Sequence, residues 1–390
     1  MKKTIIALLY AGAALCANAH TIDELLREIE ANNLELKAAR HDVSADIADA
    51  KADNTLAGPS AEFSPFWQKD VSGLSSSELI VSQEFDFPSV YAARSKAVKA
   101  REEMLSAQFD AARRDLLLDA KLQCIELVKL QQQRRLVDGR HGRLTRVLQF
   151  IRQKDSAGAS TALEVNKALM ELSTVESEIA ANETEQLSLI EALTALNGGF
   201  ELDTDSVEYA AEQMIADFET FRAEAMASDP AIVAARNAVD AAGREVDVSR
   251  TSWLPSINVG YRCNAAPGEA QNGMVVGLSF PVWSNSHRVR AARERHEAAR
   301  LRAEDTGRQL ETALRQQYIE MTQLYKSMGT YDMDMMTRTL ALLVKAVEAG
   351  QITVFEYFNE SEAVYGKIAE LIDARYRYNK VLATLTRSRL

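Results

Sequence analysis

The amino-acid sequence predicts a mainly α-helical chain with a small β part, built by internal duplication. The segment 33–40 recurs at 229–236, an offset of 196 residues. In both copies, two strand-like segments are followed by very long segments with a helical pattern. Only seven prolines occur in 390 residues, and none lies between Pro88 and Pro230, so a helix there can continue far without interruption.

The offset between the two copies changes along the chain. It is 199 between the Ala-Ala-Arg segments at 92–94 and 291–293, and it falls to 192 between Gly158 and Gly350. The fall is seven residues, one heptad, which a coiled helix can absorb without rotating its apolar seam. The two copies therefore differ by an insertion that suits long paired helices.

We predict a first repeat over residues 20–205 and a second over 206–390, each with a helix, two strands and a long antiparallel helical hairpin. For the first repeat the expected ranges are 21–56 for the helix, about 60–67 and 78–87 for the strands, and 89–197 for the hairpin. For the second they are 218–252, about 256–263 and 274–283 around a loop at 264–273, and 287–388, with hairpin helices at 287–348 and 353–388.

Residues 1–19 have the pattern of a secretory signal peptide. A basic start precedes an apolar run at 5–15, and small residues lead to Ala19, after which we expect cleavage. Leu15, rather than a small residue, precedes Cys16, so we do not expect an N-terminal lipid. Because no other stretch approaches the ~20 apolar residues of a spanning helix, the mature chain is either soluble outside the cytoplasm or crosses a membrane as strands.

Composition and motifs argue against several functional classes. The formal net charge is −11, or −13 without the two lysines of the signal peptide, whereas a nucleic-acid partner requires a basic surface. Cys124 and Cys263 lie far apart in the predicted elements, so we expect no disulfide. The sequence has no nucleophile elbow, no phosphate-binding glycine loop and no Cys or His pair with ligand spacing. We therefore expect neither catalysis nor a metal or cofactor.

The predicted strands suit a membrane. A tilted transmembrane strand needs about ten residues, and the segment 79–87 alternates apolar with polar or small residues toward its C-terminal end. Aromatic residues suited to a bilayer rim fall at or near the predicted strand ends: Trp67, Trp253, Tyr261 and Trp283.

Four strands cannot close a barrel by themselves. An open strand edge in hydrocarbon leaves unpaired backbone groups that cost several kcal/mol each, so other copies of the chain must supply the missing strands. A dimer with eight strands is conceivable, and a trimer with twelve leaves a wider lumen.

Over essentially all of the mature sequence, the chain resembles the TolC-type outer-membrane efflux proteins, also called outer membrane factors. The resemblance rests on features that occur twice in the same order: Asn/Asp-x-x-[Leu/Ile]-x-Ala-Ala-Arg at the start of each repeat, Pro-Ser before each first strand, the segments 82–87 and 279–283, and Gly-x-x-Thr-x-x-Glu from Gly158 and from Gly350. The compact size and the segment 82–87 are similar to the heavy-metal-efflux branch of this family.

The resemblance implies a homotrimer in the outer membrane, with a twelve-stranded transmembrane β-barrel, four strands per chain, continuing into a twelve-helix α-barrel across the periplasm. It implies a passive duct that docks on a periplasmic adaptor (membrane fusion) protein and, behind it, an inner-membrane pump of RND or ABC type. In this family the Gly-x-x-Thr turn lies at the docking tips, which here means Gly158, Thr161, Gly350 and Thr353.

The resemblance also points to acids that line the closed entrance of the duct. The matching acid here is Glu356, whereas the second acid of the family falls on Asn359, with Glu360 as a candidate replacement. A simpler explanation of Glu356 is a solvent-exposed helix face or an ion pair between subunits.

Two questions stay open at this point. A soluble periplasmic coiled-coil adaptor or scaffold is an alternative function, although such proteins usually have one hairpin flanked by compact β domains. The exported substrate, whether a metal ion, a drug, an amphiphile or a polypeptide, cannot be read from the sequence because the pump selects it.

Overall fold

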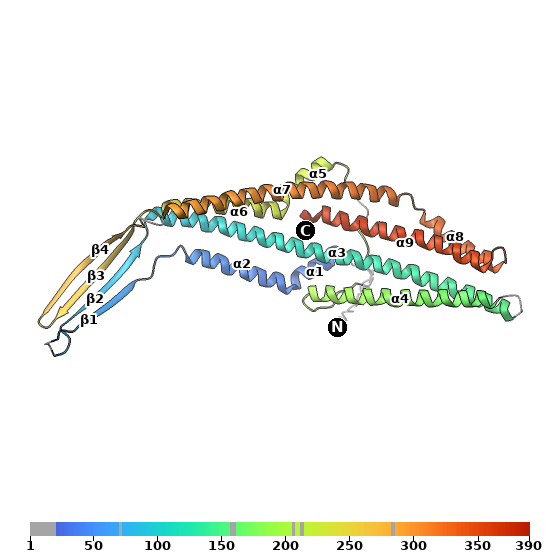
Figure 1. The fold of residues 1–390 in the computed structure, drawn as a ribbon, viewed down its shortest axis with the longest axis horizontal. Helices are drawn as coiled ribbons and strands as arrows, with labels where there is room; N and C mark the ends of the chain where they lie inside the picture. Colours follow the sequence, from blue (N-terminus) through green and yellow to red (C-terminus); the bar gives the residue numbers. More distant parts are fainter. Residues whose placement is uncertain (1–20, 70–71, 157–160, 205–206, 211–213, 282–284) are drawn as a thin grey trace, which may run out of the picture. The chain divides into compact units, whose positions relative to one another are not determined.

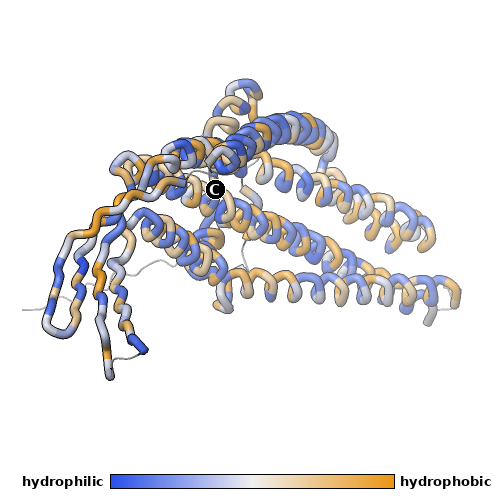
Figure 2. Tube along the Cα trace, turned by 60° about the vertical axis from the view of Figure 1, so that its left-hand side comes forward, coloured by the Kyte–Doolittle hydropathy of each residue, from blue (hydrophilic) through white to orange (hydrophobic). Residues whose placement is uncertain are grey.

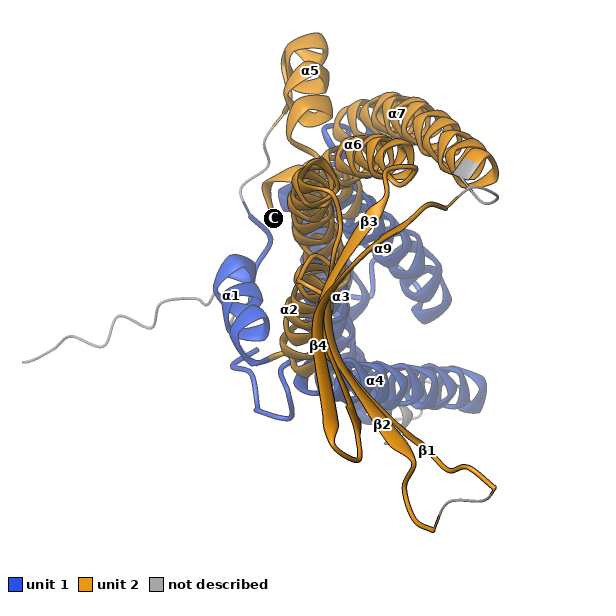
Figure 3. Cartoon of the chain, turned by 90° about the vertical axis from the view of Figure 1, so that its left-hand side faces the viewer, with its two compact units in different colours: residues 1–32, 120–213, 327–379 blue, residues 33–119, 214–326, 380–390 orange. Residues whose placement is uncertain are grey.

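The computed structural model describes residues 21–69, 72–156, 161–204, 207–210, 214–281 and 285–390. The chain forms two compact units (Figure 3), and both units draw on both predicted repeats. Unit 1 comprises Met1–Asn32, Ala120–Gln213 and Ser327–Asn379, and unit 2 comprises Asn33–Asp119, Met214–Lys326 and Lys380–Leu390. The predicted signal peptide, residues 1–19, lies outside the described residues.

Unit 1 is a helical body. It contains α1 (Ile22–Asn32), the C-terminal part of α3 (Pro88–Ser156), α4 (Ala162–Leu196), α8 (Met333–Glu348) and most of α9 (Val354–Leu385). Its core is a cluster of buried apolar side chains from α3, α4, α8 and α9, among them Val147, Ile151, Val175, Val344 and Val354. Because these residues come from both halves of the sequence, the two predicted hairpins share one core.

Unit 2 combines helices with the only sheet of the described residues. Its helices are α2 (Leu34–Ala52), the N-terminal part of α3, α5 (Phe218–Ser228), α6 (Pro230–Thr251) and α7 (Asn285–Met328), joined by the end of α9 and a short 3₁₀ turn, η1 (Arg387–Arg389). The rings of Phe218 and Tyr318 stack with their centroids 4.5 Å apart, which holds α5 against α7.

The sheet has four antiparallel strands in the order β1-β2-β3-β4 (Figure 1). They are β1 (Ser60–Phe66), β2 (Ser76–Phe85), β3 (Ser256–Ala266) and β4 (Glu269–Ser279). Each repeat contributes one hairpin, and β2 pairs with β3 across the repeats, with Val81 opposite Tyr261. The mainly helical, internally doubled fold with two strand pairs is thus confirmed.

The second hairpin is longer than the sequence predicted. The range 264–273, which we expected to be a loop, is mostly strand: β3 and β4 run on to a two-residue turn at Pro267 and Gly268. Gly268 has φ +89°, a conformation that glycine adopts without the steric cost that other residues meet. Proline followed by such a glycine makes a tight turn, so β3 and β4 stay paired up to the turn.

Three expected helices are interrupted. The helix predicted at 21–56 breaks at Asn33, and the helix predicted at 218–252 breaks at Asp229, because each residue leaves helical geometry and caps the next helix with its side chain. The helix predicted at 287–348 breaks between α7 and α8, where the side chain of Asp332 accepts a hydrogen bond from the Met335 amide. In contrast, α3 continues unbroken for 69 residues.

Candidate functional site

One face of the sheet is apolar and exposed. Side chains alternate along a strand, and residues opposite one another in an antiparallel pair point to the same face. The register therefore places Phe63 beside Leu79, and Val81 beside Tyr261 and Met274. Met274 and Val276 are 79% and 69% exposed in the single chain. The exposed apolar side chains of this face are Phe63, Leu79, Val81, Val259, Tyr261, Met274, Val276 and Leu278.

The opposite face of the sheet is mostly polar. Figure 2 shows hydrophobic and hydrophilic residues interleaved along the strands, as a two-faced sheet requires. On the polar face, Arg262 Nε lies 2.9 Å from Glu78 Oε1 across the β2–β3 pair. Other polar side chains on this face are Glu62, Glu84, Asn258, Asn264 and Gln271. The alternation seen in residues 79–87 thus extends over the sheet, which has one apolar and one mostly polar face.

A glycine allows β2 and β3 to pair closely on the polar face. A Cβ atom at Gly260 would lie 2.8 Å from Ser82 Cβ and 2.9 Å from the Val81 carbonyl oxygen. These separations are too short for any other side chain, so the sequence needs glycine at this position.

The two outer strands have free edges. Within the described residues, β1 pairs only with β2, and β4 pairs only with β3. An exposed strand edge is a template for pairing with another chain. The single chain therefore presents an apolar surface bordered by two rows of unpaired backbone groups.

Among the residues that the structure describes, no helix combines the length and the apolar character needed to cross a membrane.

The predicted rim aromatics do not all lie at strand ends. Trp67 directly follows β1 and is 71% exposed, and Trp253 precedes β3 and is 61% exposed. Because β1 and β3 run in the same direction within the sheet, these two tryptophans lie toward opposite ends of it. Tyr261 lies in the middle of β3, since the strand continues past the residue where we expected it to end. Trp283 lies outside the described residues.

The predicted tip of the second hairpin is closed by backbone hydrogen bonds around Gly350. The Gly350 amide donates to the Val347 carbonyl at 3.1 Å, and the Gln351 amide donates to the Ala346 carbonyl at 2.9 Å. This pattern is the Schellman motif, which requires a left-handed residue, and Gly350 has φ +71°. Gly158, the matching residue of the first tip, lies outside the described residues.

Thr161 and Thr353 each begin the helix that leaves a tip. The Thr161 side chain caps α4 in a capping box with Glu164. At the start of α9, the Thr353 amide donates to Glu356 Oε2 at 2.7 Å, and the Glu356 amide donates to Thr353 Oγ1 at 3.1 Å. The hydrogen bond from the Thr353 amide, and next the one from the Thr353 side chain, lower the pKa of the Glu356 carboxyl. Glu360, one turn farther along α9, is exposed.

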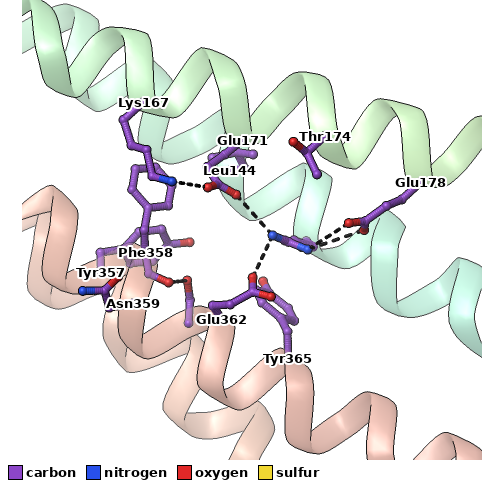
Figure 4. A pocket seen from close by; sticks show the side chains of 12 residues that line it. Leu144, Lys167, Glu171, Thr174, Glu178, Tyr357, Phe358, Asn359, Glu362 and Tyr365 are labelled. Atoms are coloured by element: carbon purple, nitrogen blue, oxygen red, sulfur yellow. Dashed lines mark hydrogen bonds and ion pairs between the residues drawn. The ribbon is translucent and has the colours of Figure 1, made fainter.

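A cluster of charges that the sequence did not reveal joins three helices of unit 1 (Figure 4). The guanidinium of Arg140 on α3 lies 3.3 Å from Glu171 and 3.4 Å from Glu178, both on α4, and 2.8 Å from Glu362 on α9. It also lies over the ring of Tyr365, 5.4 Å from its centroid. These residues line a cavity of about 280 Å³. Arg140 thereby ties the first hairpin to the second.

A second contact between the hairpins lies nearer the tips. Arg146 on α3 forms a bidentate pair with Glu348 on α8, with nitrogen to oxygen distances of 2.5 and 2.7 Å. Residues 146 and 348 are 202 positions apart, so no local pattern in the sequence could identify this pair. Charged residues on long helices instead suggested pairs within one helix.

The described residues hold two free cysteines and no cluster of metal-ligating side chains. Within these residues, no group of three or more His, Cys, Asp or Glu side chains is placed to hold a metal ion. Cys124 and Cys263 are both free, and burial raises the pKa of Cys124 to about 12, which leaves its thiol unreactive at neutral pH.

Comparison with known proteins agrees with this geometry. The family model described as "Outer membrane efflux protein" matches residues 25–199 and 222–388, one segment in each repeat. The alkaline protease secretion protein AprF of Pseudomonas aeruginosa is 26% identical over 188 residues. That match spans 44% of this chain and 38% of the length of AprF.

Solved structures show the same fold. The outer-membrane protein VceC of Vibrio cholerae superposes with a TM-score of 0.77 at 15% identity, covering 94% of this chain and 95% of VceC. The outer-membrane channel CmeC of Campylobacter jejuni gives a TM-score of 0.77 at 14% identity, covering 94% of this chain and 85% of CmeC. Since the family model matches both repeats over most of their length, the chain belongs to the outer membrane efflux protein family.

Proposed function

We propose that this protein is the outer-membrane exit channel of a tripartite efflux system, a passive duct without enzymatic activity. The observation that carries the proposal is the four-stranded sheet with one exposed apolar face, one polar face and two free edges. Transmembrane barrels have this division, with apolar side chains toward lipid and polar side chains toward the lumen.

The free edges support a homotrimer. In lipid every backbone N–H and C=O group needs a partner, so β4 of one copy has to pair with β1 of the next. Three copies give twelve strands and, as the family resemblance implies, a tunnel of twelve helices across the periplasm. Outer-membrane lipid would contact the apolar face, including Tyr261, while Trp67, Trp253 and Trp283 would lie at the two rims.

The helical tips are the proposed contact with the periplasmic adaptor, which in turn meets an inner-membrane pump of RND or ABC type. The Schellman turn at Gly350 and the caps at Thr161 and Thr353 support a docking role for these three residues. The same role is proposed for Gly158 because it holds the matching position of the first tip motif. Glu356 and Glu360, the two acids that the family resemblance suggests for the entrance of the tunnel, are both exposed in the single chain.

Export by the Sec route, with cleavage after Ala19 and no lipid on Cys16, agrees with an outer-membrane location. The substrate is less defined. AprF is named for secretion of an alkaline protease, which favours a polypeptide, whereas the similarity to the heavy-metal-efflux branch favours a metal ion.

Arginine substitutions on the two faces of the sheet test the membrane assignment. Val276→Arg places a charge on the apolar face and should cost ~2–4 kcal/mol near the bilayer midplane, strongly reducing the trimer in the outer membrane. Asn258→Arg is the matched control, because it lies one position along the sheet on the polar face and should leave the trimer level near wild type.

Membrane fractionation and detergent gels measure this outcome. Equal trimer levels in the two variants would contradict the assignment of the apolar face to lipid. Recovery of the wild-type mature chain as a monodisperse single copy in plain buffer would instead support a soluble periplasmic scaffold.

A further inference from the structure

The acid of each tip motif has the same contacts in both repeats. Glu164 Oε2 accepts a hydrogen bond from the Thr161 amide at 2.9 Å and lies 3.1 Å from Thr161 Oγ1. Glu356 Oε2 accepts from the Thr353 amide at 2.7 Å. In each case the amide of the acid donates back to the threonine hydroxyl, at 3.3 Å in α4 and 3.1 Å in α9.

The duplication allows the same motif to be compared in two different surroundings. The two tips differ at the positions between threonine and acid, which hold Ala162 and Leu163 in one and Val354 and Phe355 in the other. The threonine and the glutamate recur at the offset of 192, and so does the reciprocal hydrogen bonding. The arrangement at the start of the helix thus persists although the two residues between threonine and glutamate differ.

In this arrangement each carboxylate accepts a hydrogen bond from a backbone amide. The first amides of a helix have no partner within the helix, and the N-terminal end of the helix dipole favours a negative charge beside them. Glu356 is exposed, yet one of its oxygens is held by the Thr353 amide. Glu360 is exposed on the same helix and lies outside the capping box, so the two candidate entrance acids are not equivalent.

We propose that Glu164 and Glu356 are positioning residues that fix the first turn of the helix leaving each tip, rather than charges that line the entrance of the duct. This inference rests on the proposed function, because it concerns how the tips are shaped for gating and docking. Gln can replace Glu in a capping box because its amide oxygen also accepts the backbone hydrogen bond. A positioning role therefore depends on the acceptor, whereas a pore-lining role depends on the charge.

The proposal is tested with the full-length mature protein in planar bilayers and by amide hydrogen exchange. The variants are Glu356→Gln, which keeps the acceptor, and Glu356→Ala, which removes it. Glu360→Gln and Glu360→Ala, on the same helix but outside the capping box, are controls for the exchange measurement and should leave the Thr353 amide at its wild-type rate. The isosteric Thr353→Val removes the hydroxyl, whereas Thr353→Ser keeps it.

We expect the Thr353 amide to exchange about fivefold faster in Glu356→Ala, because loss of a helix cap costs ~1 kcal/mol. In Glu356→Gln the same amide should exchange at the wild-type rate. The exchange of the Glu356 amide should rise to a similar extent in Thr353→Val and return to the wild-type rate in Thr353→Ser. The open probability of the channel should change in Glu356→Ala but not in Glu356→Gln. The reversal potential in a KCl gradient should stay at the wild-type value in both variants.

Equal shifts of the reversal potential in Glu356→Gln and Glu356→Ala would overturn the proposal, because the two variants share only the loss of the negative charge. Unchanged amide exchange in Glu356→Ala would overturn it as well. Failure of the proposed function has a different signature: the wild-type protein would conduct no current, while the exchange measurements would still report on the caps.

Discussion

The two repeats begin with the same pair of helices but stabilise the break between them with different chemistry. In the first repeat α1 has 11 residues and is followed by α2, and in the second α5 has 11 residues and is followed by α6. Asn33 and Asp229, which are equivalent at the offset of 196, interrupt the helices and are 4% and 1% exposed. One buried cap is neutral and the other is charged.

The charged cap is supported by arginines at positions where the other repeat has small residues. Asp229 accepts from the Ala231 amide at 2.9 Å and pairs with Arg114 at 2.5 Å and Arg387 at 3.3 Å. At the repeat offsets of 199 and 192, Arg114 and Arg387 correspond to Ala313 and Ala195. Capping needs only an oxygen acceptor, whereas a buried carboxylate also needs compensating charge. The cap of α6 therefore depends on charges far away in the sequence, one of which, Arg114, belongs to the first repeat.

The largest effect should come from removing one arginine. Arg114 is 3% exposed. Among the described residues, Arg114→Ala leaves the buried Asp229 with the more exposed Arg387 as its cationic partner, so we expect a loss of about 3–5 kcal/mol. Denaturant unfolding in detergent, at constant protein concentration, measures it. The double variant Arg114→Ala with Asp229→Asn is the control and should recover part of the loss. A loss under about 1 kcal/mol in the single variant would show that water screens the charge of Asp229, as it does for an ion pair on the surface.

A smaller effect is expected when the second cap is made like the first. Asp229→Asn keeps an acceptor for the Ala231 amide but removes the charge, while Arg114 retains its pair with Asp115 at 2.6 Å. We expect a loss of about 2 kcal/mol by the same unfolding measurement. A loss as large as that of Arg114→Ala would mean that the carboxylate and the guanidinium contribute only as a pair.

The neutral cap gives a smaller effect again. Asn33 Oδ1 accepts from the Leu36 amide at 2.8 Å, and Asn33→Ala removes this acceptor. Loss of a helix cap costs about 1 kcal/mol, which should appear in the unfolding curve. Asn33→Ser, which keeps a capping oxygen, should lie within a few tenths of a kcal/mol of wild type. If Asn33→Ala were as damaging as Arg114→Ala, the contrast between the repeats would fail.

The sequence predicts the doubled architecture better than the breaks within it. The offset of 196 and the strand pattern identify the helix, strand pair and hairpin of each repeat, because periodicity is a long-range signal. The dipeptide Asp229-Pro230 is a helix start signal, with proline at the first helical position, yet it lies inside a continuous apolar pattern that indicated one helix.

Contacts that define the candidate site are the least predictable part. Arg140 and Glu362 are 222 residues apart, and their pairing depends on α3 and α9 sharing a core. The tip motifs were found from their glycines and threonines, but the sequence alone did not distinguish a capping acid from an entrance acid. That distinction depends on which oxygen accepts a hydrogen bond from which amide, and this is set by the three-dimensional structure.

The smallest predicted effect concerns the first cap of each repeat. Thr21, whose amide donates to Glu24 at 2.9 Å, corresponds at the offset of 196 to Asp217, which accepts from the Glu219 and Thr220 amides at 3.1 and 3.3 Å. The Thr220 hydroxyl and then its amide lower the pKa of Asp217. A lowered pKa means that the cap contributes above the ordinary value of 3.8 and is lost as pH falls through the lowered one.

Hydrogen exchange between about pH 6 and pH 2.5, corrected for intrinsic rates, measures this titration. Protection of the Thr220 amide should fall at the acid end in wild type, but not in Asp217→Asn, whose side chain does not titrate. The Leu36 amide, held by the neutral side chain of Asn33, is an internal control and should keep its protection over the same range. Parallel loss at Thr220 and Leu36 would indicate acid unfolding of the helices rather than titration of one cap, and would remove the charge-based contrast between the repeats.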